Sequence, residues 1–290
     1  MHCAEYGIFG AVPVSALNGE KDNEPIRGNF GTREGKVRTI IVATDLSARS
    51  DRAVERAVKL AEQHGSRLRV LNFIDEDLPL AIQQQLETAA RKEIDILLGK
   101  LARSKPVDIS TEVVCGTIDR DLPLIAEDDD ADLLVLGIHR NESGRRPLAG
   151  TTIEKTVRRS NRPVLVVSAP VKADYRKVMI GVDFSIFSRI AIRAARSMAP
   201  DAEYFAVHAF QVPFEGFQPG KATRKIVQSD HERDFSQMVE EEMAAFIPSG
   251  DGRATAGAPI RKIVRQGGPQ SVLRTEAGRL DVDLMVLGTH

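Results

Sequence analysis

The chain has 290 residues, enough for two domains of ordinary size that each bury a hydrophobic core. Its 40 basic and 41 acidic residues nearly cancel, so bulk charge gives no reason to expect nucleic acid or an anionic membrane as a partner. The apolar runs fall short of the roughly 18 uninterrupted residues that a membrane span needs. The two cysteines form no CxxC pair, which argues against a disulfide framework or a zinc site and favours the reducing cytoplasm.

The first 35 residues do not resemble the rest of the chain. A mildly apolar stretch at 8–17 precedes polar, glycine-rich sequence, and a secretory signal would need basic residues before the apolar stretch. We therefore expect residues 1–35 to be a disordered extension, or a segment outside the folded domains.

Strands and helices alternate regularly over residues 36–169. The predicted strands are uniformly apolar and cover residues 37–44, 67–74, 107–115, 132–138 and 163–168. The predicted helices cover residues 47–64, 78–103, 119–127 and 151–159. Apolar strands separated by helices are typical of a parallel sheet that is covered on both faces.

After a linker at 169–175, the same alternation starts again. Strands are predicted at 176–182, 202–209, 259–265 and 283–287, and helices at 185–198, 222–246 and 270–278. The segment TIIVATDL at 39–46 returns as KVMIGVDF at 177–184, and DADLLVLGIH at 130–139 returns as DVDLMVLGTH at 281–290. The pattern indicates two tandem α/β domains, at 36–169 and 176–290. The second is expected to lack its last helix and strand, because nothing corresponds to residues 140–168.

The candidate site lies where strands end. In open parallel sheets, ligands bind beyond the carboxyl ends of the strands at the point where strand order reverses. Asp45 follows the first strand, and the loop after the fourth strand runs from Gly137 to the Gly150-Thr151-Thr152 start of a helix. The free amides of a helix start suit a phosphate, and Arg140 adds positive charge. The alternative is a simple capping box, Thr151 with Glu154, which needs no ligand.

Taken together, these motifs resemble the universal stress protein family. Its nucleotide-binding members carry Gly, two residues, Gly, nine residues, Gly, then Ser or Thr. Here the positions are held by Gly137, Arg140, Gly150 and Thr151, so Arg140 replaces the middle glycine. The resemblance implies two doubly wound parallel sheets with strand order 3-2-1-4-5. It also implies that fifth strands of two domains pair at a dimer seam, so we expect 163–168 to be an exposed apolar edge that favours self-association or a pseudo-dimer.

The resemblance also implies the site residues. In the first domain the nucleotide-binding candidates are Ala43, Thr44, Asp45, Phe73 (through its backbone, at the adenine edge), Gly137, His139, Arg140, Gly150, Thr151 and Thr152. The second-domain candidates are Asp183, Ala209 and Gly288. Catalytic residues and metal ligands are not predicted, since the sequence contains no recognisable base, nucleophile pair or metal set.

The function implied is a stress-response regulatory protein that binds adenine nucleotide, ATP or AMP with Mg²⁺ accompanying ATP, and hydrolyses it slowly at most. The alternative is an interaction module of the same family that does not bind nucleotide. Arg140 is the residue that separates the two possibilities, because its side chain either clamps a phosphate or narrows the cleft.

Overall fold

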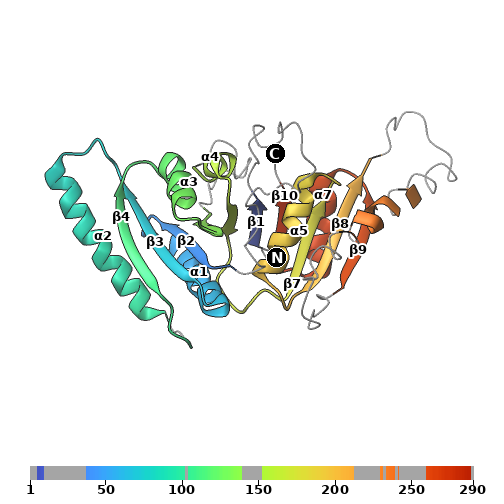
Figure 1. The fold of residues 1–290 in the computed structure, drawn as a ribbon, viewed down its shortest axis with the longest axis horizontal. Coiled ribbons are helices and arrows are strands. Elements are labelled where there is room, and N and C mark those ends of the chain that lie inside the picture. The colour runs from blue at the N-terminus through green and yellow to red at the C-terminus, as the bar shows by residue number, and fades with distance from the viewer. Residues whose placement is uncertain are drawn as a thin grey trace, which may run out of the picture. The chain divides into compact units, whose positions relative to one another are not determined.

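The computed structural model describes residues 5–9, 37–101, 104–138, 152–211, 229–230, 233–238, 241 and 259–288. The described chain divides into two compact units, one within residues 5–174 and one within residues 175–288 (Figure 1). We call them the first and second domains. Within these described segments, no helix has the length and apolarity to cross a membrane.

The first domain is built on a parallel sheet. Its strands are β2 (Thr39–Thr44), β3 (Arg67–Ile74), β4 (Ile109–Cys115), β5 (Leu133–Gly137) and β6 (Pro163–Val167). They lie in the order β4-β3-β2-β5-β6, and each neighbouring pair is parallel. This is the predicted order 3-2-1-4-5, which is confirmed. The chain moves outward from β2 to β4 and then crosses to β5, so strand order reverses beside β2.

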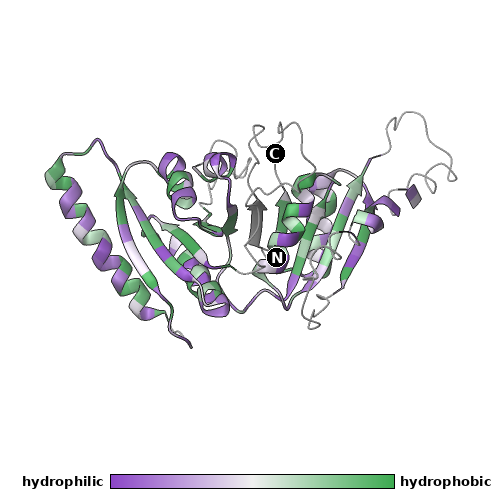
Figure 2. Cartoon of the chain, in the orientation of Figure 1, coloured by the Kyte–Doolittle hydropathy of each residue, from purple (hydrophilic) through white to green (hydrophobic). Residues whose placement is uncertain are grey.

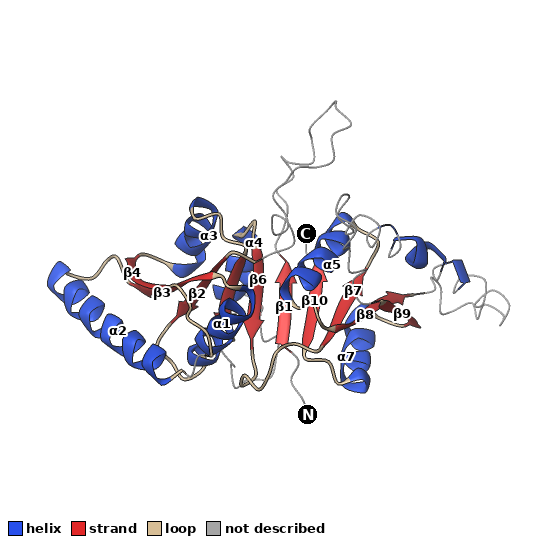
Figure 3. Ribbon diagram, turned by 60° about the horizontal axis from the view of Figure 1, so that its bottom comes forward, coloured by secondary structure: helices blue, strands red, loops and turns tan. Residues whose placement is uncertain are grey.

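Helices cover both faces of this sheet, α1 (Ser50–His64) and α2 (Leu80–Lys100) on one and α3 (Ile118–Asp128) and α4 (Thr152–Arg159) on the other (Figure 3). Strands β2, β5 and β6 are apolar and buried along almost their whole length, whereas the end strand β4 is only partly buried, and Figure 2 shows the strands coloured by hydropathy. On the α3 and α4 face the core contains Leu122, Ala126, Ile153 and Val157 from the helices.

Helix α2 buries less of its apolar surface than its sequence predicts. Its buried side chains are Ala90, Ile94 and Leu98, one stripe at four-residue spacing along the helix. Ile82 and Leu86, which the sequence places on the same packed face, are each 41% exposed. Periodicity identified the helix correctly, but the contact with the sheet begins only about half-way along it.

The N-terminal extension contributes a strand to the first domain. Strand β1 (Glu5–Phe9) pairs antiparallel with β6, with the register running from Tyr6 opposite Val166 to Phe9 opposite Pro163. The edge of β6 that the sequence predicts to be exposed therefore carries a strand of the same chain.

The second domain repeats the first four strands of this design. Strands β7 (Lys177–Val182), β8 (Glu203–Phe210), β9 (Ile260–Gln266) and β10 (Leu284–Gly288) pair in parallel in the order β10-β7-β8-β9. Helices α5 (Ile186–Met198) and α7 (Pro269–Leu280) accompany them. A fifth strand and the helix before it are missing from the described part of this domain, as the sequence predicts.

The duplicated acidic motif before the fourth strand has a structural role in both domains. Oδ2 of Asp132 accepts hydrogen bonds from the backbone N–H groups of Arg38 and Thr39, at 2.7 and 3.0 Å. Oδ2 of Asp283 accepts the corresponding bonds from Arg176 and Lys177, at 2.8 and 2.9 Å. Each carboxylate thus ties the beginning of the first strand of its domain to the beginning of the fourth.

Candidate functional site

Three of the residues predicted for the first-domain site, Asp45, Phe73 and Gly137, lie at one edge of the sheet. In the strand register Thr44 lies opposite Asn72, and Ala43 lies opposite Leu136. Asp45, Phe73 and Gly137 therefore occupy the carboxyl ends of three adjacent strands. Because β2 lies between β3 and β5, this is the point where strand order reverses, the usual ligand position in such sheets.

Asp45 presents an exposed carboxylate at this point. Its Oδ1 accepts a hydrogen bond of 3.0 Å from the backbone N–H of Ser47, which fixes the turn between β2 and α1. Partial desolvation acts to raise the pKa of Asp45, but hydrogen bonds from Ser47 and Ser50 outweigh it and leave the pKa below the ordinary value. The group is therefore an anion near neutral pH, able to accept hydrogen bonds from hydroxyl or amine donors.

Ala43 and Thr44 hold the strand end in place and do not face the solvent. Each is 4% exposed, and Ala43 belongs to the hydrophobic core. The Thr44 hydroxyl lies 2.8 Å from the Ser50 hydroxyl and accepts a hydrogen bond from the N–H of Leu46 at 3.0 Å. Because both side chains are buried, these two residues could contact a ligand only through their main-chain atoms.

Asn72 belongs to this arrangement and was not predicted from the sequence. It is buried, and its Nδ2 donates a hydrogen bond of 2.9 Å to the carbonyl oxygen of Thr44, across from β3 to the last residue of β2. Ser50, buried at the start of α1, is the other such residue. In the sequence, these two residues could have been recognised as a polar residue within a mostly apolar strand (Asn72) and a serine at the start of a helix (Ser50).

Phe73 has the backbone exposure that the predicted role requires. Pairing of β3 with β2 stops at Asn72, whereas its pairing with β4 continues through Ile74 opposite Cys115. The main chain at Phe73 thus passes the end of β2 beside Asp45. The Phe73 side chain packs against the core cluster under α3 and α4, so it is the backbone that is available to a ligand.

Gly137 is required for packing, whatever its role toward a ligand. A Cβ atom here would lie 3.0 Å from both the carbonyl oxygen of Arg49 and the Cα of Ser50. Glycine therefore lets the start of α1 approach the end of β5 closely.

The phosphate-loop part of the prediction lies mostly outside the described residues. This applies to His139, Arg140, Gly150 and Thr151. Thr152 is described, and it is the exposed first residue of α4.

The corresponding strand end of the second domain is arranged differently. Oδ1 of Asp183 accepts hydrogen bonds from the N–H and hydroxyl of Ser185, at 3.0 and 2.6 Å, and from the hydroxyl of Ser188. Ala209 packs against the hydrophobic core of this domain. At Gly288 a Cβ would lie 2.5 Å from the backbone of Phe187, so this glycine too permits close helix packing.

Three aromatic rings cluster beside this second strand end, where Asp183 remains exposed. The ring centroids of Phe184 and His208 are 4.5 Å apart, and those of Phe184 and Phe235 are 6.0 Å apart. Nδ1 of His208 lies 2.8 Å from the carbonyl oxygen of Val182, the bond that Asn72 makes in the first domain.

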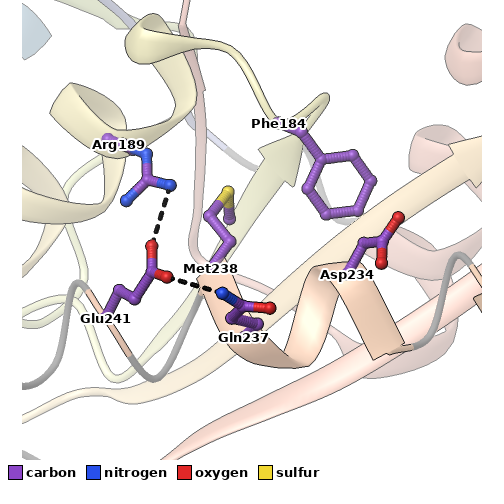
Figure 4. A pocket seen from close by; sticks show the side chains of 6 residues that line it. All are labelled: Phe184, Arg189, Asp234, Gln237, Met238 and Glu241. Atoms are coloured by element: carbon purple, nitrogen blue, oxygen red, sulfur yellow. Dashed lines mark hydrogen bonds and ion pairs between the residues drawn. The ribbon is translucent and has the colours of Figure 1, made fainter.

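Beside these rings lies a cavity of about 390 Å³ (Figure 4). Its lining residues are Phe184, Arg189, Asp234, Gln237, Met238 and Glu241. Its one guanidinium, on Arg189, lies 3.1 Å from Glu241, and hydrogen bonds from Gln237 and Arg189 hold the pKa of Glu241 below its ordinary value. Two carboxylates and one paired arginine do not favour an anionic phosphate.

No group of three or more His, Cys, Asp or Glu side chains gathers as a metal site in the part of the chain that the structure describes. If Mg²⁺ accompanies a nucleotide here, phosphate oxygens and water would be its principal ligands.

The sequence profile described as "Universal stress protein family" matches residues 36–168, the whole of the described parallel sheet of the first domain. This segment is a universal stress protein domain. Its strand order and strand-end aspartate follow the family pattern from which the site was predicted.

Individual universal stress proteins are similar to the chain over different lengths. One from Methanocaldococcus jannaschii is 25% identical over 152 residues, covering 48% of this chain and 86% of its own. The crystal structure of a universal stress protein from Archaeoglobus fulgidus, 14% identical, covers 88% of this chain and 86% of its own with a TM-score of 0.58, a likeness of fold. A universal stress protein solved in complex with cAMP is 26% identical and covers 46% of this chain and 98% of its own, with a TM-score of 0.36.

Proposed function

We propose that the universal stress protein domain binds an adenine nucleotide, ATP or AMP, and that the protein is a regulatory component of a stress response. The observation that carries the proposal is the position of Asp45. Its exposed carboxylate stands at the reversal point of the sheet, between the main-chain ends of β3 and β5. The family membership of residues 36–168 supports the choice of nucleotide.

Each part of the nucleotide has a suitable counterpart in this domain. The Asp45 anion suits the ribose hydroxyls, which donate hydrogen bonds. The backbone at Phe73 suits the polar edge of adenine. The start of α4 at Thr152, with Gly150, Thr151 and Arg140 before it in sequence, suits the phosphates, because amides at a helix start and a guanidinium both attract anions.

The proposed activity is reversible binding in the cytoplasm, with hydrolysis slow at most. An inducing stress would act through occupancy of the site, which changes what the protein contacts. The second domain is not proposed as an equal site, because the cavity beside its strand end is lined by two carboxylates and one paired arginine, which do not favour a phosphate.

Calorimetric titration of the full chain with ATP and Mg²⁺, and separately with AMP, tests the proposal. Asp45→Ala should weaken binding roughly ten- to a hundredfold, the usual effect of losing hydrogen bonds to a charged group. Asp183→Ala is the matched control and should leave the affinity unchanged. Equal losses in both variants, or none in either, would contradict the assignment to the first domain.

The second candidate is the interaction module that does not bind nucleotide. The internal use of Asp45, whose Oδ1 accepts the Ser47 N–H, favours it, since the residue has a structural role even without a ligand. Native mass spectrometry separates the two functions. A chain that carries no nucleotide and gains none at millimolar ATP supports the module, and Arg140→Gly then shows whether the bulk at that position is the obstacle.

A further inference from the structure

The last strand of the second-domain sheet, β9, borders a cavity that the proposed nucleotide site does not use. We call it the β9 cavity. Its volume is about 510 Å³, within the range of sites for small molecules, and it shares no described lining residue with the cavity beside Phe184. Among its described lining residues none is acidic and four are cationic, namely Arg261, Lys262, Arg265 and Arg279.

These cations surround β9 on both of its faces. Side chains alternate along a strand, so Arg261 and Arg265 share the face toward α7 and Lys262 lies on the opposite face. There the Nζ of Lys262 is 3.5 Å from the carbonyl oxygen of Ser236, while Arg261 pairs with Glu203 at 3.0 Å. The β9 cavity therefore receives positive charge from both sides of the strand.

A buried carboxylate holds two of these arginines in place. The side chain of Glu276 is only 6% exposed, and its two oxygens accept hydrogen bonds of 2.8 Å from Nε of Arg265 and from Nε of Arg279. A guanidinium has five N–H groups, and the bonds of each arginine within the described chain use two of them. Both arginines are about half exposed, so the remaining N–H groups are available to a ligand. Two guanidinium groups fixed side by side suit the oxygens of a phosphate.

The first domain has the same fold without this charge. Strand β9 aligns with β4 because Val264 and Val113 lie opposite corresponding residues of β8 and β3, and α7 aligns with α3 through the left-handed residues Asp281 and Asp130. At the positions of the four cations the first domain has Ser110, Thr111, Val114 and Asp128. The shared architecture therefore does not require these cations, which leaves them for another role.

The lining favours a compact and highly charged ligand. Its apolar residues Phe235, Ile263 and Val264 are 0%, 9% and 7% exposed, so they offer little surface to an apolar group. A single phosphate group carries a charge of about −2 near neutral pH, less than four cations can balance. A ligand with two or more phosphate groups matches the cavity better.

We infer that the β9 cavity binds a compact ligand carrying two or more phosphate groups, a pyrophosphate or its ester. Arg265 and Arg279 are the principal contacts, and Arg261 and Lys262 add positive charge. This site is separate from the proposed nucleotide site at Asp45, and its binding does not depend on a ligand there.

Calorimetric titration of the full chain with pyrophosphate tests the inference. Arg265→Lys and Arg279→Lys keep the charge but lose the planar fork, so each should weaken binding about tenfold or more. Arg274→Lys is the matched control, since Arg274 is an exposed residue of α7 outside the described lining, and it should bind as the wild type does. A wild-type Kd above about 1 mM, or equal affinities in all four proteins, would overturn the inference.

Glu276→Gln separates positioning from general charge attraction. The variant removes a negative charge beneath the β9 cavity, so attraction by net charge alone predicts tighter binding of pyrophosphate. Loss of the carboxylate that orients both guanidinium groups predicts weaker binding, by about tenfold. We expect the weaker binding, and a tighter complex would show that the two arginines are not a positioned pair. Circular dichroism confirms that each variant is folded.

Nuclear magnetic resonance locates the bound probe. The Nε–Hε signals of Arg265 and Arg279 should shift on addition of pyrophosphate, equally in wild type and in Asp45→Ala, whatever Asp45→Ala does to ATP binding. Shifts confined to the first domain would contradict the inference, because the probe would then bind elsewhere. A peptide of glutamates tests an acidic protein as the alternative ligand. If the peptide shifts the two arginine signals and pyrophosphate does not, the surface recognises acidic protein segments and the inference is wrong.

Discussion

The two domains begin from the same strand-end design and complete it in different ways. In the first, a small polar residue, Asn72, donates to the carbonyl of Thr44, and Asp45 remains exposed beside it. In the second, His208 lies against the carbonyl of Val182 in the same way, but its ring also stacks with Phe184. Both strand-end aspartates are exposed, but the first lies beside an amide side chain and the second beside an aromatic cluster.

The comparison shows that the features shared by the two repeats are structural ones, namely backbone conformations and hydrogen bonds that hold the strands together. Left-handed backbone conformations recur at equivalent places, Leu46 with φ 61° and Phe184 with φ 65°, Asp130 with φ 51° and Asp281 with φ 52°. Asp132 and Asp283 make the same pair of backbone bonds. The side chains around the strand-end aspartate, by contrast, differ between the two domains, as with Asn72 and His208.

The largest expected effect tests the shared part of the design. Gly288→Ala should lower the free energy of unfolding by about 2 kcal/mol and Gly137→Ala by about 1 kcal/mol, because both overpack a helix start and the contact at Gly288 is closer. Gly278→Ala, in α7 with open space around it, is the control and should raise the free energy by up to about 1 kcal/mol. Urea unfolding measures all three. A loss at Gly278 as large as that at Gly288 would refute the packing explanation.

A smaller effect is expected from acid, which should lower the unfolding free energy of the second domain through a buried carboxylate that the first domain lacks. Glu276 on α7 is buried and accepts hydrogen bonds from Arg265 and Arg279 at 2.8 Å each, whereas Ile125 holds the corresponding place on α3. Burial acts to raise the pKa of Glu276, but the two arginines outweigh it and lower the pKa. A lowered pKa stabilises the fold above the unfolded value of about 4.3, and this stability is lost as pH falls through the folded pKa.

In Glu276→Gln we therefore expect a loss of about 1–2 kcal/mol near neutral pH, kept small because both arginines are about half exposed. The loss should shrink as the pH falls below about 4, where the carboxyl is protonated in the unfolded chain. Urea midpoints between pH 3 and 7 check this. Curves of wild type and variant that stay parallel over the whole range would contradict it.

The smallest effect is expected from substitutions that give the strand end of the second domain the residue types of the first. Phe184→Leu and His208→Asn install the residue types that the first domain has at Leu46 and Asn72. Each should cost about 1 kcal/mol in unfolding free energy, and the double variant less than their sum, because the ring contact is lost only once. Additive losses in a double-mutant cycle would show that the two rings do not stabilise each other.

Much of the candidate site was predictable because parallel strands place their carboxyl ends at one edge. That rule brings Asp45 and Gly137 together from their positions in sequence, and the family resemblance added Phe73 on the neighbouring strand. It could not reveal that Gly137 packs against α1, since a close helix and a close ligand both require the absence of a Cβ. Nor could it find Asn72 or Ser50, whose hydrogen-bond partners become neighbours only after the strands pair.

By itself, the sequence determined the duplication and the alternation of strand and helix, because hydrophobic periodicity and recurring motifs are local properties of the chain. The strand order was predicted only through the family resemblance. Tertiary structure alone decided the pairing of β1 with β6, the half-exposed face of α2 and the aromatic cluster of Phe184, His208 and Phe235. Each of these depends on which residues, distant in sequence, compete for the same surface. These contacts depend on how helices and strands pack and pair, which the local sequence pattern does not specify.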